Sequence, residues 1–268
     1  MSPNLGFAIG IEIGGLSIVL HTSDAEFAGI VERRYAGFRS DPARADARLD
    51  VTIVAPETFA DQAGTELAVQ LAGGCWLIRR GDFFAEWEPR SRAGAVTQSA
   101  NPYSIDSVIR IVHSLMLAER GGFLLHSASA IRNRCAFLFS GLSGAGKTTI
   151  TRLAPADAIR LSDEVSYIRR IGERYVAFGT PFSGELNAPG ENASAPVEAL
   201  YFLVQGGDNR VNPLPVATAL RKLLRNILFF AEGEPAARVF QSACDFLAAV
   251  PAYELTFRPE AAVWKLVA

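Results

Sequence analysis

One short segment constrains the fold of this chain more than any other. Residues 141–149 read GLSGAGKTT, which fits the pattern GxxxxGK[ST], and they directly follow the apolar run Cys135–Phe139. An apolar strand, a glycine-rich loop and a helix in this order are what a P-loop requires. Because glycines let successive backbone N–H groups converge on an anion, the segment predicts a nucleotide-binding site. A glycine-rich turn without a ligand is the alternative interpretation.

Each residue type in this loop has a chemical task. Lys147 is expected to reach the β- and γ-phosphates, and the Thr148 hydroxyl is expected to ligate Mg²⁺. The predicted nucleotide-binding residues are Gly141, Leu142, Ser143, Gly144, Ala145, Gly146, Lys147, Thr148 and Thr149. The expected cofactors are therefore ATP and Mg²⁺, although the loop alone leaves the choice between ATP and GTP open.

Two further motifs flank the loop. Upstream, residues 124–130 read LLHSASA, a strand-like run that contains His126. Downstream, residues 160–165 read RLSDEV and put Asp163 and Glu164 at the end of an apolar strand. Pro155 interrupts the helix after the loop, so this helix must be short, unlike the long helix of a GTPase. Adjacent carboxylates near phosphates can accept a hydroxyl proton or hold a metal ion, and a solvated strand end is the alternative.

With these three motifs in order, the sequence resembles the HPr kinase/phosphorylase and phosphoenolpyruvate carboxykinase superfamily, and more closely its small HPr-kinase-like members. In both families a strand with an LH motif precedes a hairpin, the P-loop, a short helix and a strand that ends in two acidic residues. Here these are Leu125-His126, GLSGAGKTT and Asp163-Glu164, and the resemblance covers about residues 121–178. The order and spacing of three motifs are more specific than a P-loop alone.

The resemblance implies roles for single residues. Lys147 would stabilise charge on the transferring phosphoryl group. Glu164 corresponds to the acid that accepts the proton of the substrate serine in HPr kinases and ligates the metal in carboxykinases, and Asp163 corresponds to the preceding acid. The families usually have Asp-Asp at this point, and the extra methylene of Glu164 moves its carboxylate by about 1 Å. Which of the two acids is the base stays open.

His126 and Glu185 complete the set that the resemblance implies. His126 resembles the histidine placed near the reacting phosphate in HPr kinases and bound to the metal in carboxykinases; a core histidine is the alternative. Glu185 lies in the loop Gly179–Glu185, about where HPr kinases carry a metal-binding glutamate; a surface acid is the alternative. The predicted catalytic residues are His126, Lys147, Asp163 and Glu164. The predicted metal ligands are Thr148, Asp163, Glu164 and Glu185.

One segment of the HPr kinases has no clear counterpart in this chain. It carries a catalytic arginine, for which Arg210, Arg221 and Arg225 are the candidate substitutes. Arg221 and Arg225 also suit the solvated face of a helix, which is the favoured interpretation. Phosphorolysis, the reverse activity of the bifunctional enzymes, is therefore left open.

The rhythm of apolar residues and breakers divides the chain into a mostly β domain, residues 1–103, and a P-loop catalytic domain, residues 104–268. The expected strands are Phe7–Ile13, Leu16–His21, Leu49–Val54, Leu67–Leu71 and Trp76–Arg79, then Phe123–Ile131, Cys135–Phe139, Ile159–Ser162, Val165–Arg169, Tyr175–Phe178, Ala199–Val204, Tyr253–Phe257 and Val263–Val267. One expected helix begins at a cap on Ser104, and two more span Val216–Ala231 and Ala236–Val250. Between the domains, Ser91–Pro102 is a polar, breaker-rich stretch. The expected fold class is α/β (α+β), with a mixed-sheet core of the HPr kinase/PEP carboxykinase type.

Composition excludes several classes of protein. The chain has 268 residues, 49% of them hydrophobic, and a net charge of -2, so it can bury a substantial core. Neither a basic stripe for nucleic acid nor an apolar run of about 18 residues for a membrane span is present in the sequence. Cys75, Cys135 and Cys244 form no CxxC pair and are expected to be buried. We expect a cytoplasmic protein without nucleic-acid or membrane partners.

The leading hypothesis is an ATP- and Mg²⁺-dependent kinase that transfers the γ-phosphoryl group to a hydroxyl. The expected acceptor is a serine of a small protein or peptide, bound by the N-terminal domain. A nucleotide-sensing or assembly protein without transfer chemistry is the main alternative, and a carboxykinase, which needs a longer chain, is a weaker one. HPr kinases assemble into rings, so a homo-oligomer is open, although no interface pattern in this sequence indicates one.

Overall fold

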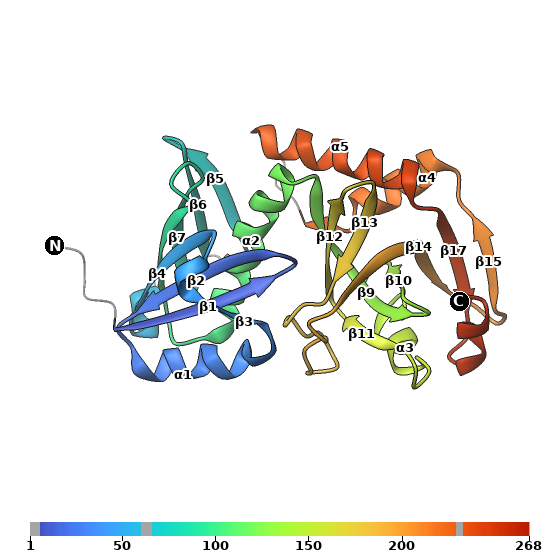
Figure 1. Ribbon diagram of the computed structural model, residues 1–268, viewed down its shortest axis with the longest axis horizontal. Helices are drawn as coiled ribbons and strands as arrows, with labels where there is room; N and C mark the ends of the chain where they lie inside the picture. The colour runs from blue at the N-terminus through green and yellow to red at the C-terminus, as the bar shows by residue number, and fades with distance from the viewer. Residues whose placement is uncertain (1–5, 60–65, 229–232, 268) are drawn as a thin grey trace. The chain divides into compact units, whose positions relative to one another are not determined.

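The computed structural model describes residues 6–59, 66–228 and 233–267 (Figure 1). The chain forms two compact units, Met1–His113 and Ser114–Ala268. This boundary falls within a helix, later in the chain than the division at residue 103 that the sequence suggests.

Unit 1 is built around a mixed sheet. Its elements are β1 (Phe7–Ile13), β2 (Leu16–Thr22), α1 (Ala25–Arg34), η1 (Ala36–Phe38), β3 (Arg39–Ser40), η2 (Pro42–Arg44), β4 (Ala47–Ile53), η3 (Pro56–Phe59), β5 (Ala68–Ala72), β6 (Cys75–Arg80), β7 (Phe83–Glu88), β8 (Ala93–Gln98) and the first part of α2 (Pro102–Glu119). The strand order is β3-β1-β2-β4-β8-β7-β6-β5. Most neighbours are antiparallel, as expected, but β4 lies parallel to both β2 and β8.

Three features of unit 1 correct the sequence analysis. Helix α1 was not expected; Asp24 caps it by accepting the backbone N–H of Phe27 at 2.8 Å. The stretch Ser91–Pro102 is no simple linker, because β8 lies inside it and pairs on both edges, with β4 and β7. Helix α2 begins before Ser104: the side chain of Asn101 accepts the backbone N–H of Tyr103 at 3.0 Å, whereas Ser104 bonds Asp82.

Unit 2 holds the P-loop on a larger sheet. After the end of α2, its elements are β9 (Gly122–Arg132), β10 (Cys135–Ser140), α3 (Lys147–Arg152), β11 (Ile159–Ser162), β12 (Val165–Ile171), β13 (Arg174–Phe178), β14 (Ser194–Gln205), β15 (Arg210–Pro213), α4 (Val216–Leu224), β16 (Ile227–Leu228), α5 (Gly233–Ala249), β17 (Ala252–Phe257) and η4 (Ala261–Lys265). The described part of the chain is therefore a mixed α/β structure, as the sequence predicts.

The strands of unit 2 form the order β10-β9-β12-β13-β14-β17-β15. Strand β10 also pairs with β14, in parallel, so the path β10-β9-β12-β13-β14 closes on itself. The long strand β14 makes this closure possible: Ser194–Pro196 pairs with β13, whereas Val197–Phe202 pairs with β10. Because β10, β14 and β17 are parallel, their carboxyl ends reach the same edge of the sheet, where the P-loop begins.

Alternating side chains of the central strands separate the core of unit 2 into two layers. Leu138 of β10 and Phe202 of β14 belong to a cluster that includes residues of α4 and α5. Their neighbours Phe139 and Tyr201 belong to a second cluster that includes Ile150 of α3 and residues of η4. This period of two is that of a sheet with both faces buried. The P-loop helix α3 therefore packs on one face of the sheet, and α4 and α5 pack on the other.

Two expected elements near the C-terminus differ from the structure. The helix expected over Val216–Ala231 ends at Leu224, because the Asn226 side chain donates to the Lys222 carbonyl at 2.8 Å and β16 follows. Residues 229–231 of that expectation lie outside the described residues. The strand expected over Val263–Val267 is instead the 3-10 helix η4, whose Trp264 indole donates to the Ile150 carbonyl at 3.0 Å.

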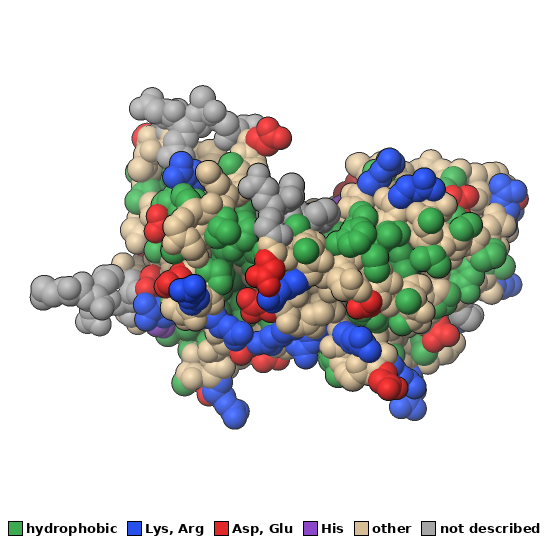
Figure 2. All heavy atoms as spheres, turned by 90° about the horizontal axis from the view of Figure 1, so that it is seen from above, with side chains coloured by type: hydrophobic (Ala, Val, Ile, Leu, Met, Phe, Trp, Pro, Cys, Tyr) green, Lys and Arg blue, Asp and Glu red, His purple; other side chains and the backbone are tan. Residues whose placement is uncertain are grey.

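The surface and the cysteines complete the description. Hydrophobic side chains gather on the side of unit 2 seen in Figure 2. The exposed hydrophobic side chains of the described residues include Val216 of α4 and Phe240 of α5. The three cysteines are half-buried rather than buried, and none forms a disulfide. Among the described helices, none combines the length and the apolar character that a membrane span needs.

Helix α5 offers a matched test of this packing. Phe246 is fully buried, with its ring edge-on to Phe123 at 5.4 Å and to Tyr175 at 5.1 Å, whereas Phe240 on the same helix is 49% exposed. Phe246→Ala is expected to lower the free energy of unfolding by about 3–5 kcal/mol, because it leaves a cavity. Phe240→Ala is expected to change it by about 0.5 kcal/mol. Urea unfolding measures both, and equal losses would contradict the packing described.

Candidate functional site

The P-loop connects the end of β10 to the start of α3. Gly144 and Gly146 have φ angles of 79° and 104°, a region that residues with a Cβ rarely adopt. A Cβ on Gly146 would also lie 2.7 Å from the Phe257 ring at the end of β17, whereas one on Gly144 would meet nothing within 4 Å. Both the positive φ and the lack of space therefore require glycine at 146, whereas only the positive φ requires it at 144.

Lys147, the first residue of α3, turns back towards the loop that precedes it. Its Nζ donates to the carbonyl of Gly141 at 2.9 Å and to that of Leu142 at 3.3 Å. Burial lowers the pKa of its ammonium group below the ordinary value, and the negative charges of Glu185 and Glu164 partly oppose this shift. The ammonium group is thus a desolvated cation held by two neutral carbonyls, and an anion in the loop would compensate it better.

Asp163 and Glu164 form the turn between β11 and β12, and they have different surroundings. Asp163 is only 4% exposed, and its two oxygens accept the backbone N–H groups of Gly184 and Leu186, both at 3.0 Å. Glu164 is half-buried, and its backbone N–H donates to the Ser162 hydroxyl at 3.1 Å. Asp163 therefore fixes the loop that carries Glu185.

The position of His126 is set by its own backbone. It lies in β9 opposite Val165 of β12, and its carbonyl accepts the Ser140 hydroxyl at 3.0 Å. Its N–H donates to the carbonyl of Asn226 at 2.7 Å. These bonds join the histidine to the end of β10, where the P-loop starts, and to the segment after α4. The half-buried imidazole is thus held beside the loop rather than deep in the core.

Buried hydroxyl groups underlie the acidic turn. The Ser166 hydroxyl bonds those of Ser127 at 2.9 Å and Ser129 at 2.8 Å. The Ser162 hydroxyl accepts the N–H of Val165 at 3.0 Å, and the Thr180 hydroxyl donates to the Val165 carbonyl at 2.8 Å. Since buried polar groups are costly unless they are paired, these bonds fix the turn relative to β9.

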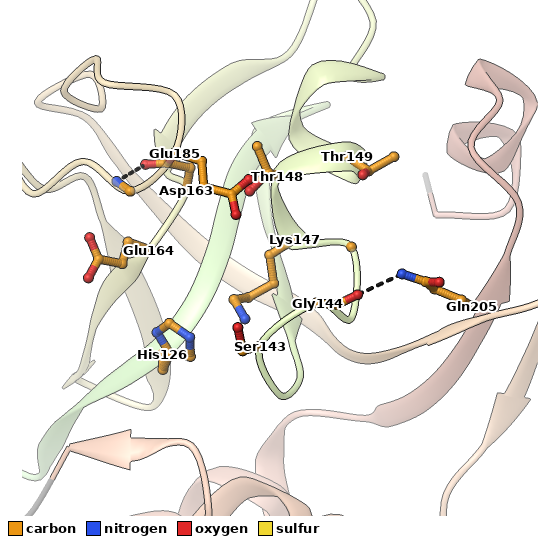
Figure 3. Close-up of a pocket in the computed structure, with 12 residues that line it drawn as sticks. His126, Ser143, Gly144, Lys147, Thr148, Thr149, Asp163, Glu164, Glu185 and Gln205 are labelled. Carbon is orange, nitrogen blue, oxygen red and sulfur yellow. Dashed lines mark hydrogen bonds between the residues drawn. The ribbon is translucent and has the colours of Figure 1, made fainter.

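These elements enclose one cavity of about 210 Å³ beside the P-loop. It is lined by His126, Ser143, Gly144, Gly146, Lys147, Thr148, Thr149, Asp163, Glu164, Gly184, Glu185 and Gln205. Figure 3 shows His126, Asp163, Glu164 and Glu185 on one side of Lys147 and Gln205 on the other. All four predicted catalytic residues and all four predicted metal ligands therefore meet at this cavity, together with most of the predicted nucleotide-binding loop.

Three predicted residues lie elsewhere, and two lining residues were missed. Gly141, Leu142 and Ala145 line a second cavity on another side of the loop. Gln205, at the carboxyl end of β14, donates to the Gly144 carbonyl at 2.6 Å. The parallel strands β10 and β14 bring Gln205 to the P-loop, and a strand expected over Ala199–Val204 was the signal for it. Gly184 was named only as part of the Glu185 loop.

The three candidate arginines lie on β15 and α4. Arg210 on β15 pairs with Asp208 at 3.9 Å, and Arg221 on the exposed side of α4 donates to Thr218 at 3.4 Å. Arg225, at the end of α4, lines the second cavity. None of them lines the cavity that holds His126 and Glu164.

The donor set suits Mg²⁺ bound together with a nucleotide. Within residues 6–59, 66–228 and 233–267, no three His, Cys, Asp or Glu side chains gather closely enough to hold a metal by themselves. Mg²⁺ usually keeps several waters and takes one or two carboxylates plus substrate phosphates. The Thr148 hydroxyl and the carboxylates of Glu164 and Glu185 on one cavity fit that mode of binding.

Comparisons with known proteins give one family and distant structural similarities. A family model described as "SynChlorMet cassette protein ScmC" matches residues 96–267, more than half of the chain. No curated protein matches the sequence. Among solved structures, the Hpr(Ser) kinase/phosphatase from Coxiella burnetii is similar with a TM-score of 0.30 and 12% identity, over 53% of this chain and 90% of that chain. The α/β fold class rests on the sheets and helices described above.

The two loop glycines give a prediction with its own control. Gly146→Ala is expected to abolish Mg·ATP binding and to lower the melting temperature, because it adds the contact with Phe257 to a backbone strain of about 1–3 kcal/mol. Gly144→Ala adds only the backbone strain, so it is expected to lower the free energy of unfolding by about 1–2 kcal/mol. Calorimetric titration and thermal unfolding measure both effects, and equal losses in the two variants would contradict the close approach.

A second prediction concerns the pH dependence of stability. Between the lowered pKa of Lys147 and its ordinary value of 10.5, the unfolded state binds more protons than the folded state, so wild-type stability rises with pH. Lys147→Met removes this buried cation. At neutral pH the variant is expected to melt at least as high as the wild type, and its advantage is expected to shrink as the pH approaches 10.5. A wild type that is the more stable at neutral pH would argue against a net cost of burial.

Proposed function

The chain belongs to the family of the SynChlorMet cassette protein ScmC, and we propose that it is a P-loop kinase. It would transfer the γ-phosphoryl group of ATP, with Mg²⁺, to a hydroxyl, with a serine of a small protein or peptide as the acceptor. One observation carries the proposal: Lys147, Thr148, His126, Glu164 and Glu185 line a single cavity. A phosphate loop alone needs none of these acids, whereas phosphoryl transfer to a hydroxyl uses a base and a metal site.

The loop would bind the nucleotide in the following way. Backbone N–H groups of the loop and of the first turn of α3 would surround the phosphates. The Lys147 ammonium would turn from the Gly141 and Leu142 carbonyls to the β- and γ-phosphate oxygens, as its desolvation favours. Gln205 would keep the tip of the loop in place through the Gly144 carbonyl. The loop and its lysine would thus hold the reacting phosphoryl group in position for transfer.

The acids would divide the remaining tasks. Thr148 and Glu185 would ligate Mg²⁺, which neutralises charge on the phosphates when bound. Glu164 would be the base, because Asp163 already accepts two backbone N–H groups. The acceptor oxygen would form a bond to the γ-phosphorus, the bond from that phosphorus to the bridging oxygen of ADP would break, and the acceptor proton would pass to Glu164. His126 would orient the γ-phosphate from the edge of the cavity.

The acceptor and the cellular compartment are proposed from the family's description and from general chemistry. The family is described as a cassette protein, which fits an enzyme whose acceptor is made from the same cassette. An ATP-consuming reaction and three unpaired cysteines both suit the cytoplasm. Products of the same cassette are therefore the first acceptors to offer.

One observation favours the alternative of a nucleotide sensor. In the structure the Lys147 ammonium satisfies carbonyls of its own loop, so nucleotide binding would switch the loop between two states even without transfer. A sensor would bind Mg·ATP and release neither ADP nor a phosphorylated acceptor.

The test separates the two acids. Glu164→Gln is expected to keep Mg·ATP binding within about threefold and to lower transfer by about 10²–10⁴-fold, the usual contribution of a general base. Asp163→Asn, unlike Glu164→Gln, is expected to lower the melting temperature, because its amide nitrogen then faces a backbone N–H donor. Labelling of cassette proteins with γ-labelled ATP measures transfer, and calorimetry measures binding.

Lys147→Met provides the control for the nucleotide site, since it should remove Mg·ATP binding altogether. Wild-type protein that binds Mg·ATP yet labels none of the cassette proteins would contradict the kinase proposal and support the sensor. Unchanged transfer in Glu164→Gln would remove this residue as the base.

A further inference from the structure

The second cavity lies against the first half of the P-loop and has a volume of about 410 Å³. Besides Gly141–Ala145, it is lined by Phe202, Leu203, Val204, Lys222, Arg225 and Asn226. It shares Ser143 and Gly144 with the cavity that holds His126 and Glu164. The tip of the P-loop is therefore a common wall of the two spaces, and a molecule in the second cavity touches the loop without entering the phosphate site.

The second cavity is lined by both apolar and cationic side chains. Phe202, Leu203 and Val204 of β14 line it, and Leu142 at the loop tip is 68% exposed. The Lys222 ammonium pairs with Glu254 at 3.1 Å and lies over the Phe202 ring, 5.8 Å from its centroid. Arg225 is exposed and has no acidic partner within residues 6–59, 66–228 and 233–267. The cavity therefore suits a ligand with an apolar group next to a carboxylate.

Backbone hydrogen bonds join the segment that carries Arg225 to His126. Asn226, which follows Arg225, is buried, and its carbonyl accepts the N–H of His126 at 2.7 Å. Strand β16 then pairs Ile227 with Leu125, next to His126. The side chain of Arg225 is exposed, but its backbone belongs to the segment that adjoins His126.

The nucleoside would not occupy this cavity. Lys147, Thr148 and Thr149, which start the helix that would bind the phosphates, line the first cavity together with Gln205 and are absent from the lining of the second. The Lys147 ammonium, which would meet the γ-phosphate, lies at the carbonyls of Gly141 and Leu142, and these two residues do line the second cavity. A group bound there would thus approach the γ-phosphate end of the nucleotide.

We propose that the second cavity is the acceptor subsite, which takes a peptide segment with an apolar side chain beside a carboxylate that pairs with Arg225. The proposal rests on the kinase function proposed above. The serine hydroxyl of such a segment would reach past the loop tip towards the γ-phosphate and Glu164. Arg225 determines specificity here by contact with the acceptor, and it takes no part in the transfer step.

The experiment uses synthetic serine peptides and the full chain. One set carries a leucine near the serine and an aspartate moved through the flanking positions, and the matched set carries lysine instead of aspartate. Wild type, Arg225→Gln and Arg225→Glu are compared with Arg221→Gln, a control on the exposed side of the same helix that does not line the cavity. Two quantities are measured: transfer, as kcat/KM, and peptide binding, as fluorescence anisotropy with Mg²⁺ and a non-hydrolysable ATP analogue.

We expect wild type and Arg221→Gln to prefer the best aspartate peptide by about tenfold or more in both quantities, Arg225→Gln to lose this preference, and Arg225→Glu to prefer lysine. A reversed preference is a result that mere loss of structure cannot produce. No preference in the wild type, or an unchanged preference in Arg225→Glu, would overturn the subsite. A changed KM for ATP in Arg225→Gln would also overturn it, because the cavity would then hold the nucleoside.

Failure of the kinase function is distinguishable from failure of the subsite. If wild type transfers to no peptide yet binds aspartate peptides through Arg225, the cavity binds acidic peptides and the kinase proposal fails. If wild type transfers to serine peptides with equal rates for both sets, the kinase proposal holds and the subsite is wrong. If wild type shows no transfer and no peptide binding, both proposals are overturned.

Discussion

Backbone pairing on both edges of β10 is the constraint on which the site depends. One edge pairs antiparallel with β9, which carries His126, and the other pairs in parallel with β14, which ends at Gln205. A strand that is paired on both edges cannot shift its register without breaking backbone hydrogen bonds to both neighbours. The start of the P-loop is therefore fixed between a histidine and a glutamine that lie far apart in the sequence.

The polar groups beneath the acidic turn show how the protein holds charge near its core. Serine hydroxyls in the middle of strands would destabilise a sheet if they were unpaired, yet Ser127, Ser129 and Ser166 bond one another. Through Ser162 and Thr180 the same kind of bonding reaches the turn of Asp163 and Glu164. Asp163 in turn fixes the Glu185 loop by accepting the backbone N–H groups of Gly184 and Leu186. Buried hydroxyls thus fix the backbone of the acidic turn, and backbone N–H groups of the Glu185 loop hold the Asp163 carboxylate.

The sequence predicted the parts of the site that depend on short motifs. The P-loop, the short helix after it, and the meeting of His126 with Asp163 and Glu164 all follow from local patterns whose order matches a known arrangement. What it could not predict depends on pairing between distant segments. Strand β8 reads as a polar stretch because neighbours on both edges, rather than its own side chains, make it a strand. Arg225 is an exposed residue at the end of α4, as the sequence predicts, but its place beside the P-loop cavity depends on the pairing of β16 with β9.

The lysine that bonds its own loop has a consequence for selectivity. A ligand must replace two hydrogen bonds of Lys147 before it gains any from it, so the apparent affinity of every anion is reduced by the same opening free energy. In the proposed kinase, a triphosphate with many oxygens would offset that free energy, whereas a single inorganic phosphate would make fewer contacts with the loop. The hydrogen bonds of Lys147 to its own loop would thus set a minimum number of contacts that a bound anion has to make.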